Sequence, residues 1–540
     1  NVASEITGQI RFYDLISLMI FTVRYLFLFL VEEQSTSTLD AETLRNGETE
    51  HQESKNGHNK QLRRLETVPD IKRDTSGITT QYIAAGIGKK YQFLLNIFVP
   101  LKLMLNGTNK NLVTVLTDRT SFESWVASLL CLGAVFGSVP AGLISQYFGR
   151  KKTLLYLALP MLVSWILVAS SPNEYGLHVG RFVGGISVGA ISVSIPPYVE
   201  DIAEKQLLPT LANFYHVHLS CGILFGFIIG MVENTTWFSV LCASIPIAFF
   251  VAFIFLPESP TYLMSQGKFH EAKAALRYYR GIDNDIDSEL KSLKEHLRSS
   301  AKTRVTFKDL LETRATLKAL FVSFALMLFQ QLSGFYPIIF YARRIFEAFD
   351  ISLEPANAAI LLGFCFVSST YFTTMLLKVV RRRVLLLISF FTMLLSLAGL
   401  SIYFHLIASR YQLDNTWIPL SCLCLHVSVY AAGAGPIPWL MLREIFPQNV
   451  TRRATAITAG LHWFLAFAVI KLHRNLEAKV KSGWTLWLYA ISCLVGILFV
   501  YFFVPETKDR TLEEIQDEFD GIHKMKKHTH IIEVECFSGV

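Results

Sequence analysis

Charged residues are scarce in this chain: Asp, Glu, Lys and Arg together make up only 17% of its 540 residues. A soluble chain of this length carries more charge. Hydrophobic residues account for 52% of the sequence, 41 residues are phenylalanine, and the mean hydropathy is +0.39. The scarcity of charge excludes an ordinary soluble protein and favours a chain with many membrane-spanning segments.

Cysteines with the paired spacing of a disulfide framework are also missing. The eight cysteines lie mostly inside apolar stretches rather than in polar loops, so we expect no disulfide scaffold. Cys422 and Cys424 share one apolar stretch, and we expect no metal site there.

The net charge of +7 does not indicate nucleic-acid binding, because the basic residues form short runs between apolar stretches. These runs are Arg150-Lys151-Lys152, Arg381-Arg382-Arg383 and Arg452-Arg453. The positive-inside rule places such runs in cytoplasmic loops.

Twelve apolar stretches from Gln81 onward are candidates to cross the hydrocarbon core as helices. We expect them near 82–105, 124–147, 153–171, 177–199, 210–232, 237–256, 317–341, 357–379, 384–407, 418–442, 454–474 and 484–504. The charged segment 257–316 divides six from six, and its periodicity predicts cytosolic helices at His270–Arg280 and Ile286–Leu297. An even count with a cytosolic middle places both ends of the bundle in the cytosol.

Residues 1–77 are expected to differ from the rest. Residues 10–31 are apolar but contain charges, and they indicate an extra span, a signal-like segment or a mistranslated intron. The polar residues 32–76 are expected to be disordered. Because the chain begins at Asn1, we expect a fragment or an incomplete translation.

Two adjacent amides, Gln330 and Gln331, lie inside the seventh apolar stretch, where lipid offers them no hydrogen bonds. One helical face there carries Gln330, Gly334, Pro337 and Tyr341. Such a face suits a watery cavity and a ligand rich in hydroxyls. The alternative is that both amides simply bond neighbouring helices.

Several spans carry glycines four residues apart. These are Gly133/Gly137, Gly185/Gly189 and Gly222/Gly226/Gly230. Small residues on one helical face let helices approach closely, and a bundle whose helices slide needs such close contact. Static helix packing explains the glycines equally well.

Short motifs follow one another in and beside the spans. In chain order they are Gly149-Arg150-Lys151, Arg181-x3-Gly185-x3-Gly189, Pro196-x-Tyr198 with Asp201, Pro257-Glu258-Ser259-Pro260, Gln330-Gln331-Leu332-Ser333-Gly334, Gly435-Pro436-Ile437-Pro438-Trp439, Glu444-Ile445-Phe446-Pro447 and Pro505-Glu506-Thr507-Lys508. From about Gln81 to Phe519 this set resembles the sugar porters of the major facilitator superfamily, and most closely the insect facilitated trehalose transporters.

The resemblance implies an all-α membrane protein with the twelve-helix major facilitator fold. Two six-helix lobes, 78–256 and 317–504, would flank a cytosolic helical linker at 257–316 and precede a cytosolic tail at 505–540. The implied function is facilitative transport of trehalose or a hexose across the plasma membrane by alternating access. Its partners would be the sugar and the lipid bilayer, with no nucleic acid, no cofactor and no enzymatic reaction.

Carried over residue by residue, the resemblance places Gln330, Gln331 and Trp439 against the sugar and Trp463 in the cavity wall. Amides supply a donor and an acceptor to paired hydroxyls, and an indole offers a flat face to a pyranose. Pro436 and Pro438 would break the tenth span beside Trp439 and free backbone groups to line a cavity.

The sequence departs from the family at other sugar-site positions. Three amides are replaced by His216, Tyr336 and His462, and Phe366 replaces a fourth. The two histidines could be proton carriers; we favour neutral polar substitutes for the amides.

A cytoplasmic latch is also implied. Its members would be Arg150, Lys151, Arg181, Asp201, Glu258, Glu444 and Arg452. The acidic Asp201 and Glu444 are kept, but Gln146 stands in place of an acid, and Thr451 stands in place of an arginine. These losses favour the alternative function, a non-transporting sugar sensor or inactive paralogue.

Between Gly77 and Leu105 the sequence has no Asp or Glu. Proton-coupled porters of this kind tend to carry a carboxylate in the first span, so the resemblance implies a passive uniporter. The sequons at Asn106 and Asn234 would face outside and predict glycosylation there.

Overall fold

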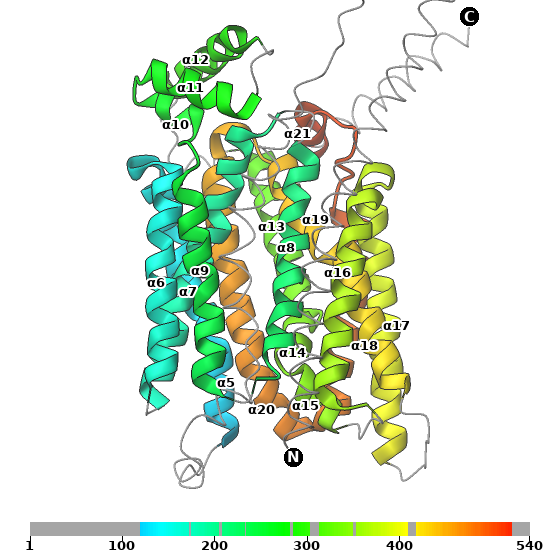
Figure 1. Cartoon of the computed structure of the whole chain (residues 1–540). Coiled ribbons are helices and arrows are strands. Elements are labelled where there is room, and N and C mark those ends of the chain that lie inside the picture. The colour runs from blue at the N-terminus through cyan, green and yellow to red at the C-terminus, as the bar shows by residue number, and fades with distance from the viewer. Residues whose placement is uncertain are drawn as a thin grey trace, which may run out of the picture. The chain divides into compact units, whose positions relative to one another are not determined.

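The structure is a computed structural model of the chain, and its description covers eight segments. These are residues 119–171, 174–204, 208–232, 234–280, 285–302, 313–348, 353–408 and 417–520. All belong to one compact unit, Thr80–Val540, and within the described residues the regular elements are all helices (Figure 1). The expected span at 82–105, the apolar run at 10–31 and Asn106 lie outside these segments.

Five long helices form the first half of the bundle. They are α5 (Arg119–Phe148), α6 (Arg150–Ser170), α7 (Glu174–Ile202), α8 (Leu208–Ile229) and α9 (Thr235–Ile254). Their bounds match the expected second to sixth spans to within a few residues. Helix α7 packs against both α5 and α6, and α6 packs on α9.

The paired glycines bring α5 and α7 into backbone contact. A Cβ atom added at Gly189 would lie 1.9 Å from the carbonyl oxygen of Ala134, and one at Gly137 would lie 2.0 Å from that of Ile186. The close approach expected from the glycine spacing is confirmed for this pair of helices.

Three shorter helices, α10 (Pro260–Ser265), α11 (Phe269–Arg280) and α12 (Ile286–Lys302), form the segment between the halves. They lie at the upper end of the bundle in Figure 1, which we call the latch end. Arg280 fixes them there, because its Nη1 donates to the carbonyl of Ile202 (2.5 Å) and its Nη2 to that of Ala203 (3.2 Å). The helices expected in this segment are confirmed.

The second half has more interruptions than expected. Its elements are α13 (Arg314–Leu332), α14 (Phe335–Phe340), α15 (Ala342–Ala348), α16 (Pro355–Val379), α17 (Arg382–Ala408), α18 (Trp417–Val429), the π-helical turn η2 (Tyr430–Ala434), α19 (Pro436–Glu444) and α20 (Gln448–Phe503), followed by α21 (Leu512–Asp520). The stretch 317–341, expected as one helix, is broken at Gly334, and the break that Pro436 and Pro438 predict within 418–442 is confirmed.

Helix α20 contains two of the expected spans, 454–474 and 484–504. Lys481 interrupts its helical path, with φ 68° and ψ 159°. Beyond this residue the chain runs antiparallel to α17, since Ser401 Oγ donates to the carbonyl of Gly483 (2.6 Å) and Arg383 donates to that of Tyr501. The chain thus turns within α20 without a separate loop.

Nine helices in the described segments are long and apolar enough to cross a membrane. This number counts α20 once and leaves out α8, whose fully described apolar part is only Tyr215–Ile229. The two halves meet where α5 packs against α20 and α8 packs against α16.

Candidate functional site

A small cavity lies where α8 faces the broken helices of the second half. Its walls are Tyr215, His216, Leu219, Phe335, Tyr336, Phe366, Thr370, Tyr430, Ala431, Gly435, Pro436, Trp439, His462 and Trp463. It leaves about 20 Å³ for the centres of water molecules, whereas one water needs at least about 10–15 Å³. This conformation is closed around the cavity, and a larger ligand requires the helices to move.

The break between α13 and α14 turns Phe335 and Tyr336 toward the cavity. Gly334 adopts a left-handed conformation there, with φ 82°. A Cβ atom at this position would lie 2.7 Å from the ring of Tyr489, so both the backbone and the space favour glycine.

The break between α18 and α19 is held by Gln330. Pro438 has no N–H, so the carbonyl of Ala434 loses its usual helical donor. Gln330 Nε2 replaces it, donating to the carbonyls of Ala434 (2.7 Å) and Gly435 (2.8 Å). In this conformation Gln330 bonds a neighbouring helix, as the alternative interpretation held, and its buried Oε1 has no hydrogen-bond partner among the described residues.

His462 is the centre of the polar wall. Its Nδ1 lies 2.9 Å from Gln331 Nε2, and its Nε2 lies 3.1 Å from the hydroxyl of Tyr336. The ring of Trp439 meets it edge-on at a centroid distance of 4.9 Å. A neutral imidazole protonated on Nε2 satisfies both bonds. Gln331 Oε1 is buried and has no hydrogen-bond partner in the described structure.

Trp463 reaches across to the first half. Its indole N–H donates to Ser192 Oγ on α7 at 3.3 Å, and its side chain is 1% exposed. The predicted cavity-wall residue therefore also joins the two halves of the bundle.

A network at the latch end fixes the loop before α6; we call it the first latch. Arg150 pairs with Asp201 at 2.8 Å, and Ser259 Oγ donates to the same carboxylate. Glu258 accepts the backbone N–H groups of Lys151 (2.7 Å) and Lys152 (3.4 Å) at the start of α6. A carboxylate is favourable at this position because it meets the positive end of the helix dipole.

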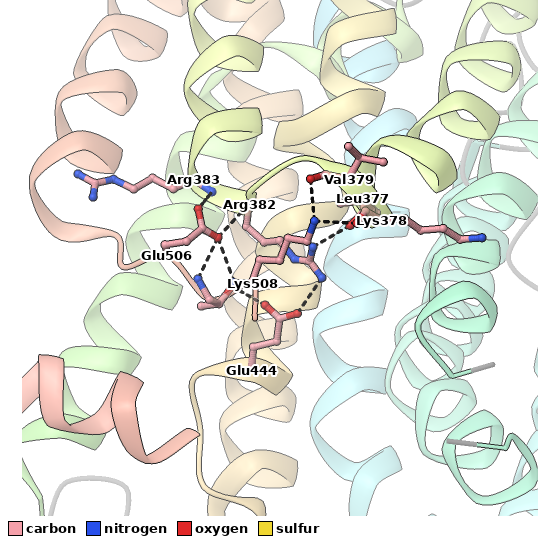
Figure 2. A network of polar contacts seen from close by, with 9 residues as sticks. Leu377, Lys378, Val379, Arg382, Arg383, Glu444, Glu506 and Lys508 are labelled. Atoms are coloured by element: carbon pink, nitrogen blue, oxygen red, sulfur yellow. Dashed lines mark hydrogen bonds and ion pairs between the residues drawn. The ribbon is translucent and has the colours of Figure 1, made fainter. Parts of the chain in front are cut away.

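A second latch repeats this plan before α17 (Figure 2). Arg382 pairs with Glu444 at 3.4 Å, and Glu506 accepts the backbone N–H groups of Arg382 (3.0 Å) and Arg383 (3.1 Å). Lys508 Nζ donates to the carbonyls of Lys378 and Val379 that end α16, at 2.7 Å each. Each latch joins residues of one half only.

Other ion pairs join the two halves, and they occur at both ends of the bundle. At the latch end Arg443 contacts Glu200 at 2.6 Å. At the opposite end the buried carboxylate of Glu123 contacts Arg344 at 2.6 Å and Arg474 at 3.7 Å. Closure at both ends agrees with the small cavity between them.

Comparison with known proteins identifies the family. The family model described as sugar (and other) transporter matches residues 50–519. The chain belongs to this sugar transporter family. The match begins upstream of the resemblance seen in the motifs, and it covers both halves of the bundle.

Curated relatives and solved structures agree with this assignment. The facilitated trehalose transporter Tret1 of Bombyx mori is 36% identical over 409 residues, which is 75% of this chain and 80% of that protein. The Tret1-2 homolog of Drosophila sechellia is 33% identical over 417 residues, 75% of this chain and 85% of the other.

The proton:xylose symporter XylE, solved with 6-bromo-6-deoxy-D-glucose, superposes with a TM-score of 0.67 at 23% identity. The superposition covers 83% of this chain and 100% of XylE. The expected major facilitator fold is confirmed, and the chain is a multi-pass membrane protein of a transporter family rather than an enzyme.

Within this sugar transporter, the predicted site residues fall into two groups. The cavity wall contains His216, Tyr336, Trp439, His462 and Trp463. The two glutamines are not among the residues that line the cavity, and their amide N–H groups bond Ala434, Gly435 and His462.

The predicted latch residues are also divided. Arg150, Lys151, Asp201 and Glu258 meet in the first latch, and Glu444 lies in the second. Arg181 does not join them: its Nε donates to the carbonyl of Val126, at 3.2 Å. It precedes Asp201 on the same helix by roughly 30 Å of rise, which is too far for contact.

Two further members of the predicted set need separate placement. Arg452 lies within electrostatic reach of Asp201 and Glu200, from the start of α20. Asn234 is exposed and caps α9, accepting the backbone N–H groups of Thr236 (2.9 Å) and Trp237 (3.2 Å).

Sequence reasoning missed several residues that the structure brings to these sites. They are Tyr215, Phe335 and Tyr430 in the cavity wall, Arg382 in the second latch, and Glu123 in the ion pairs of the opposite end. Glu123 carried a signal, since an acid just inside an apolar span needs a partner.

Proposed function

We propose that this member of the family is a facilitative uniporter that carries trehalose or a hexose by alternating access. The observation that carries the proposal is a cavity at the meeting of two broken helices, one of which presents Trp439 to it. Broken helices free backbone groups where they can line a polar cavity. The names of the Tret1 relatives support trehalose as a substrate class.

The cavity chemistry supports sugar binding by the wall and the amides behind it. Trp439 offers a flat indole face, while His216, Tyr336 and His462 offer nitrogen and hydroxyl groups. Gln330 and Gln331 each keep a buried oxygen without a hydrogen-bond partner among the described residues, and a sugar hydroxyl can reach it once the helices part. We assign these residues and Trp463 to the substrate site.

A passive mechanism is supported by the make-up of the cavity. None of the residues that line it in the described structure is Asp or Glu. The stretch from Gly77 to Leu105 also has no acid in the sequence. We therefore assign His216 and His462 to polar contacts rather than to proton transfer.

Uptake by cells that express the chain tests this proposal. Labelled trehalose or hexose should equilibrate across the membrane and not accumulate, and a protonophore should leave the initial rate nearly unchanged. Accumulation that a protonophore abolishes would contradict uniport. Cells that express a surface-delivered Trp439→Ala variant provide the control for uptake through the cavity.

The rival function is a non-transporting sugar sensor or inactive paralogue. It was favoured by the loss of basic latch residues, but Arg150 and Arg382 each pair with an acid in the structure. Two assembled latches support a working carrier. Sugar-dependent thermal stabilisation of the purified protein without any uptake would instead establish the rival.

We further propose a plasma-membrane location with the latch end, both termini and the linker 257–316 in the cytosol. The lobes would be 78–256 and 317–504, with glycans at Asn106 and Asn234 outside. The basic residues of both latches support this orientation. Terminal epitope tags should be reached by antibody only after permeabilisation; staining of an N-terminal tag on intact cells would contradict it and indicate an additional span at 10–31.

A further inference from the structure

We propose that Cys365 and Cys424 form a modification site, at which a peroxide converts the two thiols into a reversible disulfide between α16 and α18. The inference goes beyond the proposed function, and only its expected effect on uptake rests on that function. The positions of the two side chains carry it, since both cysteines are free thiols in this structure.

The two thiols meet where α16 packs against α18. Across that contact the side chains of Cys365 and Cys424 are hydrogen-bonded to each other. A second contact has the same register, because the Thr373 hydroxyl donates to the carbonyl of Ala431 at 3.1 Å, about two helical turns farther along both segments. The thiols are therefore neighbours because of the way the two helices pack.

Cys422, in the same apolar stretch as Cys424, faces a different helix. A Cβ atom added at Gly399 of α17 would lie 3.7 Å from Cys422 Sγ. Residues two apart in a helix point in different directions, so α18 presents Cys422 to α17 and Cys424 to α16. The pairing with Cys365 is thus specific to Cys424, and Cys422 provides a matched control.

A small oxidant can reach the pair. Both thiols are half-buried, and the adjacent side chains of Phe364 and Leu425 are 55% and 46% exposed. They therefore lie beside the exposed surface of the bundle and not in its sealed interior.

The reaction with hydrogen peroxide consumes one peroxide and both thiols. One sulfur attacks a peroxide oxygen, the O–O bond breaks, and a sulfenic acid and one water form. The second sulfur then attacks the sulfenic sulfur, so the S–S bond forms, the S–O bond breaks and a second water leaves. The two thiols are oxidised by two electrons, the peroxide is reduced by two, and the thiol protons leave in the water.

The new bond would lie beside the cavity. Phe366 follows Cys365 on α16, Tyr430 follows α18 at the start of η2, and both line the cavity. Because the closed cavity is too small for a sugar, these walls have to separate when a sugar enters. A covalent bond between α16 and α18 opposes that movement, so we expect oxidation to slow uptake.

Mass spectrometry of the purified full chain in detergent tests the site. The protein is treated with hydrogen peroxide, unfolded without reductant and labelled with N-ethylmaleimide. It should carry two fewer adducts than the reduced protein, its digest should contain the peptides of Cys365 and Cys424 linked to each other, and dithiothreitol should reverse both changes. Oxidised protein without this linked peptide overturns the inference.

Three substitutions locate the reaction. Cys365→Ser and Cys424→Ser should each abolish the linked peptide and the loss of two adducts, whereas Cys422→Ser should oxidise as the parent chain does. A peptide that links Cys365 to Cys422 instead would overturn the assignment.

Uptake by cells that express the chain separates this inference from the proposed function. Peroxide should remove most of the initial rate of trehalose or hexose uptake in the Cys422→Ser variant, dithiothreitol should restore it, and Cys365→Ser should resist the treatment. Undiminished uptake by cross-linked protein would refute the restraint on the cavity. A disulfide in a protein that shows no uptake in either state supports the modification site and refutes the carrier.

Discussion

Replacing Gly189 by alanine is expected to destabilise the folded protein strongly. The added Cβ would lie 1.9 Å from the carbonyl oxygen of Ala134 and 2.6 Å from its Cα and carbonyl carbon. These are backbone atoms, so no side-chain rotation relieves the clash, and α5 and α7 must separate. We expect a loss of about 3 kcal/mol or more, the upper end of overpacking, out of a total stability of about 5–15 kcal/mol.

Fluorescence-detected gel filtration of detergent extracts measures this loss as a smaller monodisperse peak. Gly142→Ala is the control on α5, the helix that packs against α7, because its Cβ would meet only Val193 Cγ1, at an ordinary 3.8 Å. If Gly189→Ala gave the same peak and melting temperature as Gly142→Ala, the backbone contact between α5 and α7 would be refuted.

Replacing Gln331 by alanine should weaken sugar binding by about 1–3 kcal/mol, or roughly tenfold to hundredfold. The substitution removes the unpaired acceptor behind the polar wall and also the partner of His462 Nδ1. A sugar hydroxyl in this water-poor site then loses a hydrogen bond that solvent does not replace.

Gln330→Ala is the comparison variant, because this second substrate-site amide also holds the break between two helices and its loss should lower affinity and thermal stability together. Its amide N–H groups hold the carbonyls of Ala434 and Gly435 in the closed conformation, so its loss should lower the melting temperature of the ligand-free protein. Gln331→Ala should lower affinity more than thermal stability. Unchanged uptake by Gln331→Ala at normal surface expression would show that the sugar site lies elsewhere.

The positions of the helices could be predicted from the sequence, because each span is marked by its own hydrophobic run and by the basic residues in the loops beside it. The helix breaks were harder to predict. Proline marked the break at Pro436, but the break at Gly334 needed the ring of Tyr489, which lies far away in the sequence. An interruption between 474 and 484 was expected, but the turn itself lies at Lys481, a residue type that does not mark a break, and Gly483 comes two residues later.

Only part of the candidate site could be predicted from the sequence. The resemblance to the sugar porters indicated that Trp439 and His462 would be at the cavity, where the structure places both. The partner of an amide depends on the three-dimensional packing, so nothing local showed that Gln330 would replace the missing donor of Pro438. The role of Arg382 was hidden because a run of three arginines does not show which one faces an acid.

The ion pairs between the halves set an energetic balance between the two directions of opening. In the proposed alternating-access cycle, opening at the latch end would break Arg443–Glu200 and opening at the other end would break Glu123–Arg344, so the weaker set would determine the side on which the empty protein rests open. For a passive carrier this imbalance makes half-saturating concentrations differ between the two faces. The maximal transport rates in the two directions must differ in the same proportion. A passive carrier produces no net flux when the sugar concentrations are equal, so the ratio of maximal rate to half-saturating concentration has to be the same in both directions.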